Sequence, residues 1–349
     1  MVPLLDEPQR RLFHVAAALL GIAFLTKAAT WPLCFWLPPT YAVASPPSAA
    51  AFAIMTKVGV YVILRLSMLN FGVDAGASAG FGGPVIILGG MATMAYGTIG
   101  VLSVQSPQLK GGYIALISAG TLLSAVGISI IGGGAQILSG ALFYMVASTI
   151  AVAAFYLLAE PISQIEGEVD DTVSEPDAAE YRWAPMMGTV EDEPAPAFER
   201  TAPWSILGVC FALLTAILAG LPPFPGFIGK FAMLSGAIRD NISTRGVIPE
   251  ILWVYTALLI ISGFAVLIAL MRLGIRRFWA SDAQPPRLLA LEIWPIIIIL
   301  AMIAFQTYKA GPLLSYTNAT ANDLKHPSVY RDAVLGAPVV RPKSDGGHE

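Results

Sequence analysis

Apolar runs of about 20 residues recur along the sequence as far as residue 308, and no other feature limits the fold as much. An α-helix needs about that many residues to cross the hydrocarbon core of a bilayer. Only 12% of the residues are charged, whereas soluble domains average roughly 25%. The sequence therefore predicts an all-α polytopic membrane protein with about eight transmembrane helices. We expect the spans near residues 12–32, 48–69, 84–104, 112–132, 136–158, 204–240, 250–271 and 288–308.

The 20 basic and 23 acidic residues are unevenly placed along the chain. Residues 160–200 hold 12 acids and two bases, whereas the rest of the chain has a net positive charge. A segment this rich in Glu, Asp, Pro and Ala cannot form a core, so we expect an acidic loop over 159–203. The sequence offers no basic surface for a nucleic acid, and no nucleic-acid partner is expected.

The sequence lacks the motifs that hold cofactors. Cys34 and Cys210 stand apart with no C-x-x-C pair, which excludes a disulfide framework, a zinc site and an iron–sulfur site within the chain. Neither H-E-x-x-H nor G-x-G-x-x-G occurs. We therefore expect no cofactor and no metal site, and an enzymatic activity of the chain itself is left open without being favoured.

The distribution of arginines predicts the orientation in the membrane. The connection over 272–287 carries four arginines with only Asp282 against them, so the positive-inside rule places it in the cytoplasm. Alternation of the spans then puts three other connections on the same side, namely the 33–47 turn, the turn at Lys110 and the acidic 159–203 loop. A short N-terminal segment over 1–11 and a polar C-terminal tail over 309–349 are expected outside.

Two of the spans, near 27–47 and 218–230, are interrupted by prolines and aromatic residues next to a lysine. Proline inside a helix removes a backbone hydrogen bond and clashes with the preceding turn. In hydrocarbon, a broken helix persists only where protein or a water-filled cavity satisfies its backbone, and a pair of such spans is typical of inverted-repeat transporters. We expect the helices to break at Pro32, Pro38, Pro39, Pro222, Pro223 and Pro225.

Three lysines lie within or beside these apolar runs: Lys27, Lys57 and Lys230. A cation at the centre of a bilayer helix costs roughly 2.5–3.5 kcal/mol on insertion scales, and such residues usually serve a function. A long stem can instead carry the ammonium to the interface, but Lys57 lies about 13 Å along its helix from Ser48. Because a lysine in apolar surroundings can release and regain a proton, we expect a proton relay. For Lys110, interfacial anchoring and proton uptake both remain open.

Two stretches resemble the signature regions of a known family. They are FLTKAATWPLCFWLPPTYAVASPPSAAAFAIMTKVGVYVILRL over 24–66 and LAGLPPFPGFIGKF over 218–231. Both are similar to the proton-translocating family shared by the Mrp cation/proton antiporters and the antiporter-like subunits of respiratory complex I. Within that family the sequence is most similar to the D subunits of the Mrp (Mnh, Pha) antiporters, and the resemblance covers roughly residues 10–310.

The resemblance implies positions in an antiporter-like fold of fourteen helices that contains two inverted repeats. It places Lys27 in the broken seventh helix, Lys57 in the eighth and Lys230 in the broken twelfth, and it implies that the three form the central proton path. Residues 12–158 then correspond to the seventh to eleventh helices and 204–308 to the twelfth to fourteenth. The first six helices, with the glutamate that pairs with the lysine at the Lys27 position, are missing from this sequence. We therefore expect little antiport from the 349-residue chain, and restored antiport from an upstream-extended form.

Three functions follow from these observations. The leading one is a membrane subunit of a multisubunit antiporter that exchanges Na⁺ or another monovalent cation for protons, lying in the bilayer of a bacterial inner membrane beside the other subunits. The second is a proton-pumping membrane subunit of an NADH-quinone-type oxidoreductase. The third is a truncated product that does not transport.

Overall fold

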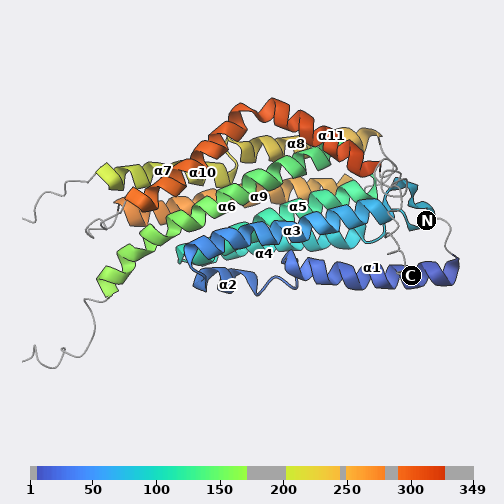
Figure 1. The fold of residues 1–349 in the computed structure, drawn as a ribbon, viewed down its shortest axis with the longest axis horizontal. Coiled ribbons are helices and arrows are strands. Elements are labelled where there is room, and N and C mark those ends of the chain that lie inside the picture. The colour runs from blue at the N-terminus through green and yellow to red at the C-terminus, as the bar shows by residue number, and fades with distance from the viewer. Residues whose placement is uncertain (1–5, 171–201, 244–248, 280–289, 327–349) are drawn as a thin grey trace, which may run out of the picture.

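The computed structural model describes residues 6–170, 202–243, 249–279 and 290–326, and every regular element among them is helical. Most helices run side by side along the long axis of the molecule (Figure 1), as expected of an all-α membrane bundle. They are α1 (Glu7–Lys27), α2 (Leu37–Val43), α3 (Pro46–Phe71), α4 (Gly83–Ser103), α5 (Pro107–Ile131), α6 (Ala135–Asp170), α7 (Ala202–Ala219), α8 (Pro225–Ser243), α9 (Pro249–Gly274), α10 (Ala290–Tyr308) and α11 (Ala310–Lys325), with a 3-10 segment, η2 (Val73–Ser78), and a π-helical turn, η6 (Ile275–Trp279).

Among the described residues, five helices are long and apolar enough to cross a membrane: α3, α4, α5, α6 and α9. A sixth span is possible if α10 and α11, which meet at an angle of 77°, are counted together. The expected count of about eight is therefore not confirmed. The difference arises because the helices next to the breaks are shorter or more charged than a continuous span: α7 is apolar but short, and α1 carries charged residues at both ends.

Helix α5 lies at the centre of the bundle, and nearly all of its span is buried. Glycines let α4 approach it closely: a Cβ added at Gly120 would lie 2.6 Å from the carbonyl oxygen of Gly90. Small residues at helix contacts are the usual means by which membrane helices pack tightly. The close packing fixes the rotation of α5, and this rotation decides which neighbours its polar side chains meet.

Two described helices extend into regions that the sequence predicted to be loop or tail. Helix α6 continues to Asp170, so the first residues of the expected 159–203 loop are helical; residues 171–201 of that loop lie outside the described residues. Helix α11 occupies part of the expected polar tail. It is held against α6, where Ser139 and Thr317 share a hydrogen bond of 2.9 Å and Lys325 donates to the Gly133 carbonyl.

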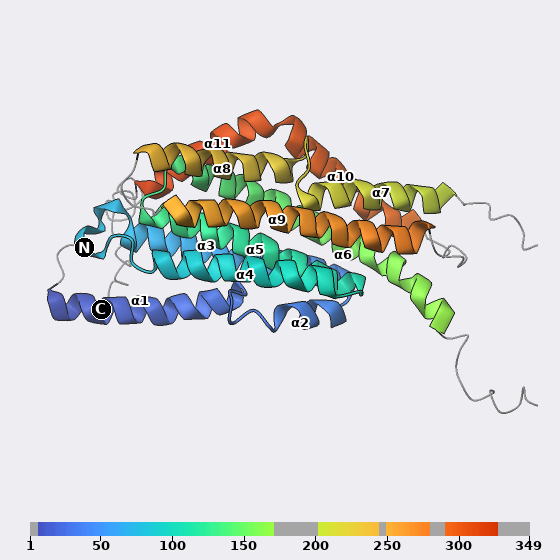
Figure 2. The same ribbon diagram turned by 180° about the vertical axis from the view of Figure 1, so that it is seen from behind.

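The connections that were predicted to share the cytoplasmic side lie at one end of the bundle. The guanidinium of Arg276, at the end of α9, donates a hydrogen bond of 2.6 Å to Oε1 of Gln105 in the α4–α5 turn. Helix α6 ends and α7 begins at the same end of the molecule in both views (Figures 1 and 2). Helix α1 begins and α11 ends at the opposite end.

Candidate functional site

The first predicted break is present between α1 and α2. Helix α1 ends at Lys27, and the following residues, Ala28 to Thr30, are buried. The interrupted backbone is satisfied by protein groups, because the N–H of Trp31 donates to Oγ1 of Thr93 at 2.7 Å and the indole of Trp36 donates to the carbonyl of Thr26 at 3.1 Å. A broken helix in hydrocarbon requires such hydrogen bonds for its exposed backbone groups. Pro32 lies within the break, whereas Pro38 and Pro39 lie in the first turn of α2, where proline fits a helix.

Lys27, at the edge of this break, does not lie in the interior. Its side chain is exposed on the outer surface of the described bundle. Its backbone, however, contacts α3 closely: a Cβ added at Gly59 would lie 3.2 Å from the Lys27 carbonyl carbon and 2.9 Å from the nitrogen of Ala28. Gly59 is two residues after Lys57, so the break lies directly beside the turn of α3 that carries the second lysine.

Lys57 is buried, with 5% of its surface exposed. Its Nζ donates a hydrogen bond to the Oγ of Ser118 on α5, and this hydroxyl donates in turn to the carbonyl of Ala115 at 2.8 Å. One residue earlier on α3, the hydroxyl of Thr56 shares a hydrogen bond with Tyr41 of α2. The lysine therefore ends in a polar contact inside the bundle instead of reaching the membrane interface.

The second predicted break separates α7 from α8 and contains Pro222 and Pro223, while Pro225 begins α8. Gly220 turns the chain with a φ of 81°, in the left-handed region that glycine adopts without strain. Lys230 is buried, and its Nζ donates to the carbonyl of Ala219 at 3.3 Å, just before the break. A carbonyl freed by the helix break thus becomes the acceptor for the lysine.

Tyr144 on α6 provides the other contact of Lys230. The Nζ of Lys230 lies 5.9 Å from the centre of the Tyr144 ring, within the range of a cation–π interaction. The ammonium is therefore held between a backbone carbonyl and an aromatic face, and no described carboxylate forms an ion pair with it.

A small cavity of about 20 Å³ is lined by one contact residue of each buried lysine, although neither lysine lines it. Its polar lining comprises Ser118, which binds Lys57, Tyr144, which contacts Lys230, and Ser148. A site needs about 10–15 Å³ of this kind of volume, and two or more polar partners, to hold one water molecule. The cavity therefore has the size and the polar groups for a water between the two lysines.

On its other side, Lys230 lines a wider cavity of about 340 Å³ between the break, α8 and α9. Apolar residues form the rest of its wall, including Phe231 and Phe264, which are 60% exposed at the bundle surface. Lys230 therefore lines a space that reaches the surface, and its contact residue Tyr144 lines the small cavity.

Lys110 has a different environment from the other lysines. It is buried, and its Nζ donates to the carbonyls of Val101 and Val104 at 3.2 and 2.6 Å, at the end of α4. A cation at this position satisfies the last carbonyls of the helix and interacts favourably with its dipole. Lys110 lines neither the small cavity nor the wider one, so its observed contacts are those of a helix cap.

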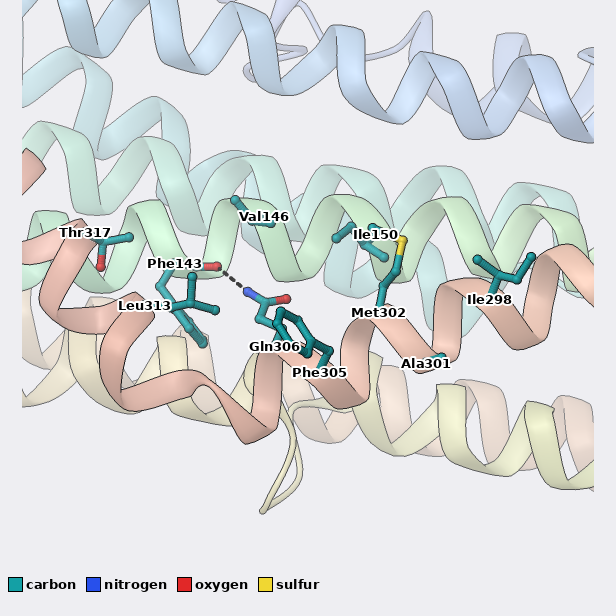
Figure 3. A pocket seen from close by; sticks show the side chains of 10 residues that line it. All are labelled: Phe143, Val146, Ile150, Ile298, Ala301, Met302, Phe305, Gln306, Leu313 and Thr317. Carbon is teal, nitrogen blue, oxygen red and sulfur yellow. Dashed lines mark hydrogen bonds between the residues drawn. The ribbon is translucent and has the colours of Figure 1, made fainter.

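A further cavity, of about 510 Å³, lies between α6 and the bent pair α10–α11 (Figure 3). Its lining is apolar except for Thr317 and Gln306, whose Nε2 donates to the Phe143 carbonyl at 3.3 Å. No lysine lines it. The size of a cavity is therefore a poor guide to the lysine site, because the contacts of both buried lysines line the small cavity of about 20 Å³.

Comparison with known proteins agrees with this geometry. Residues 7–173, which include the first break and Lys57, match the family described as "NADH:quinone oxidoreductase/Mrp antiporter, TM". The D subunit of a probable K⁺/H⁺ antiporter from Rhizobium meliloti is 44% identical over 348 residues, which are 96% of this chain and 61% of the relative. Residues 7–173 are thus similar to the NADH:quinone oxidoreductase/Mrp antiporter family, and nearly the whole chain is similar to an antiporter D subunit.

Other known proteins are similar to nearly the whole chain. The D subunit of the Na⁺/H⁺ antiporter from Alkalihalophilus pseudofirmus is 27% identical, covering 94% of this chain and 59% of the relative. The solved Mrp complex from Dietzia sp. has the same fold, with a TM-score of 0.71 and 19% identity over 95% of this chain and 62% of that chain. The chain thus spans about three fifths of the length of these relatives.

Three polar residues of the candidate site could not be predicted from the sequence, namely Ser118, Tyr144 and Ser148. Each lies in an apolar helix where serine and tyrosine are common and carry no charge that would mark them. A weak signal exists for Tyr144 and Ser148, which are four residues apart and therefore share one face of α6. Nothing in the sequence indicates that Ser118 faces Lys57.

Proposed function

We propose that this chain is a membrane subunit of a multisubunit monovalent cation/proton antiporter, and that protons pass between Lys57 and Lys230 inside it. The observation that carries the proposal is the small cavity shared by Ser118 and Tyr144, the contacts of the two lysines. The antiporter names of the relatives from Rhizobium meliloti and Alkalihalophilus pseudofirmus support the same class of activity. Because the chain spans only part of those relatives, the activity and the other subunits are proposals for it.

The proton path uses groups that can both donate and accept. A protonated Lys57 donates to the hydroxyl of Ser118, and a water in the cavity can take that proton toward Tyr144 and Lys230. A neutral Lys230 then accepts it. The resulting ammonium is stabilised by the Ala219 carbonyl and the Tyr144 ring.

Charge couples the steps of this relay. Neighbouring ammonium groups repel one another in a low-dielectric interior, so protonation of one buried lysine favours proton release from the next. Lys27 extends the relay on the other side of Lys57, because the break that begins after Lys27 contacts α3 at Gly59. Its exposed ammonium lies where a further helix or subunit could supply a carboxylate. A K⁺ or Na⁺ ion that enters this path when a lysine loses its proton would take over the positive charge. The cation would then be exchanged for the proton.

The experiment is a flux measurement on the assembled antiporter. The chain, in its longest natural form, is expressed with its partner subunits, and everted vesicles are tested for proton movement on addition of K⁺ or Na⁺. Lys57→Ala and Lys230→Ala should each reduce flux to background while the amount of protein in the membrane is unchanged. Lys309→Ala, which removes an exposed lysine that lines none of the three cavities, serves as the matched control and should transport normally. Normal flux from Lys57→Ala or Lys230→Ala would contradict the proposal.

A further inference from the structure

Helix α9 presents an apolar face to the outside of the bundle along its whole length. It runs across the outer surface in Figure 2. Large side chains at helical spacing are about half exposed or more. They are Trp253, Ile260, Phe264, Ile268, Met271 and Ile275. Within a membrane protein, such a face is suited to the acyl chains of lipid.

The apolar face of α9 ends in two exposed arginines. Arg272 continues the four-residue spacing of Phe264 and Ile268, and Arg276 follows one turn later at the junction with η6. Arg276 is held in place by its 2.6 Å hydrogen bond to Gln105. Both guanidiniums lie at the bundle end that the arginine distribution predicts to be cytoplasmic.

A third cation lies close to this pair. Lys110 lies in the first turns of α5, next to the α4–α5 turn in which Gln105 accepts the hydrogen bond from Arg276. Among the side chains that the structure describes, no carboxylate forms an ion pair with Arg272 or Arg276, and Glu7 pairs with arginines at the other end of the bundle. Three like charges this close repel one another, and a bound anion would reverse that cost.

We propose that Arg272 and Arg276 form a binding site for the phosphate headgroup of an anionic phospholipid, whose acyl chains lie along the apolar face of α9. Charge complementarity favours a phosphate, because guanidinium groups bind phosphate oxygens through paired hydrogen bonds. The apolar face favours a lipid over a free anion, since inorganic phosphate would make no apolar contact with Phe264, Ile268 and Met271. Basic groups at the cytoplasmic end of membrane helices attract anionic headgroups in this way.

Photocrosslinking tests this site directly. The full chain is reconstituted in phosphatidylcholine vesicles with a trace of phosphatidylglycerol that carries a photoreactive group on one acyl chain, and the labelled residues are mapped by mass spectrometry. Label is expected on α9 near Phe264 and Ile268. Excess phosphatidylglycerol should displace it, whereas excess phosphatidylcholine or millimolar inorganic phosphate should not. Displacement by phosphate, or equal displacement by phosphatidylcholine, would overturn the proposal of a specific lipid site.

Variants provide the second arm of the test. Arg272→Gln with Arg276→Gln should weaken phosphatidylglycerol binding about thirtyfold, which corresponds to about 1 kcal/mol for each lost cation. Arg272→Lys with Arg276→Lys should retain most of the binding because this double variant keeps both positive charges. Arg10→Gln with Arg11→Gln removes two arginines at the opposite end of the bundle and should leave binding unchanged. The proposal would be contradicted if Arg272→Gln with Arg276→Gln left phosphatidylglycerol binding unchanged. It would also be contradicted if Arg10→Gln with Arg11→Gln weakened that binding equally.

Discussion

The ammonium of Lys57 donates a hydrogen bond to the hydroxyl of Ser118 across the contact between α3 and α5. The same hydroxyl lines the small cavity whose opposite wall includes Tyr144, the aromatic neighbour of Lys230. Two buried lysines from segments far apart in the sequence are therefore related through one serine, one tyrosine and a space that fits a water. This arrangement gives the proposed relay specific atoms that can be changed one at a time.

Ser118→Ala should lower cation-driven proton flux strongly, because it removes the acceptor for the Lys57 ammonium and one polar wall of the cavity. A hydrogen bond to a charged group is worth about 1.5–3 kcal/mol, so we expect flux to fall by about tenfold or more. Ser124→Ala is the matched control, since Ser124 lies on the same helix, is buried and bonds to the Gly120 carbonyl of its own helix. Equal proton flux in Ser118→Ala and Ser124→Ala would show that Ser118 is not part of the proton path.

Substitutions at Tyr144 should distinguish the ring from the hydroxyl. Tyr144→Phe keeps the aromatic face 5.9 Å from the Lys230 ammonium, whereas Tyr144→Leu removes it. Because a partly desolvated cation–π contact contributes about 1–2 kcal/mol, the leucine variant should lose several-fold more flux than the phenylalanine variant. The measurement is flux in everted vesicles, normalised to the amount of assembled complex. The reverse order would show that the hydroxyl, and not the ring, is what Lys230 requires.

The breaks and the three lysines could be predicted from the sequence because proline and charge are conspicuous in apolar helices. The depth of Lys57 was expected from its distance to the start of its span, and Lys230 is buried as well, but nothing in the sequence indicates that Lys27 is exposed on the described bundle. Depth depends on the rotation of each helix and on its neighbours, and neither is encoded in a local pattern. The cap formed by Lys110 was missed for the same reason, since its acceptors are carbonyls at the end of α4.

The helical order near the C-terminus could not be predicted either. Helix α11 is polar, and it is held by contacts with Ser139 of α6 and with Gly133 in the turn before α6, which are distant in sequence. The bend of 77° before it lies at Lys309, just before Gly311 and Pro312 in the first turn of α11, and was not among the expected breaks. Tertiary packing decided this element, as it does for most short helices.

Gly59→Ala should destabilise the folded chain and loosen the contact between α3 and the first helix break. The new methyl group would lie 2.9 Å from the backbone nitrogen of Ala28, and a backbone atom cannot move aside easily. Overpacking of this kind costs about 1–3 kcal/mol, so thermal unfolding in detergent should shift down by a few degrees. Gly21→Ala, where nothing lies within 4 Å of the added atom, should be neutral or stabilising because alanine favours a helix. An unchanged unfolding temperature for Gly59→Ala would argue against the close contact of α3 with the break.

The acidic segment should be cytoplasmic and dispensable for flux. A cysteine at Ser174 should react with an impermeant thiol reagent in everted vesicles but not in intact cells, and a cysteine at Gln9, at the opposite end of the bundle, should show the reverse. The native cysteines, Cys34 and Cys210, are buried and should give little background. Labelling of the Ser174 cysteine from outside would invert the proposed topology.

The most direct test fills the cavity between the two lysines. Ser148→Leu places a bulky apolar side chain in a space of about 20 Å³ and should exclude the water that joins Ser118 to Tyr144. Ser148→Ala should keep the space open, and Val146→Leu, on the same helix but facing the cavity of about 510 Å³, should leave the path intact. The measurement is K⁺- or Na⁺-driven proton flux in everted vesicles that contain equal amounts of assembled complex. The proposed relay predicts background flux for Ser148→Leu and near-normal flux for the other two, whereas normal flux from Ser148→Leu would contradict it.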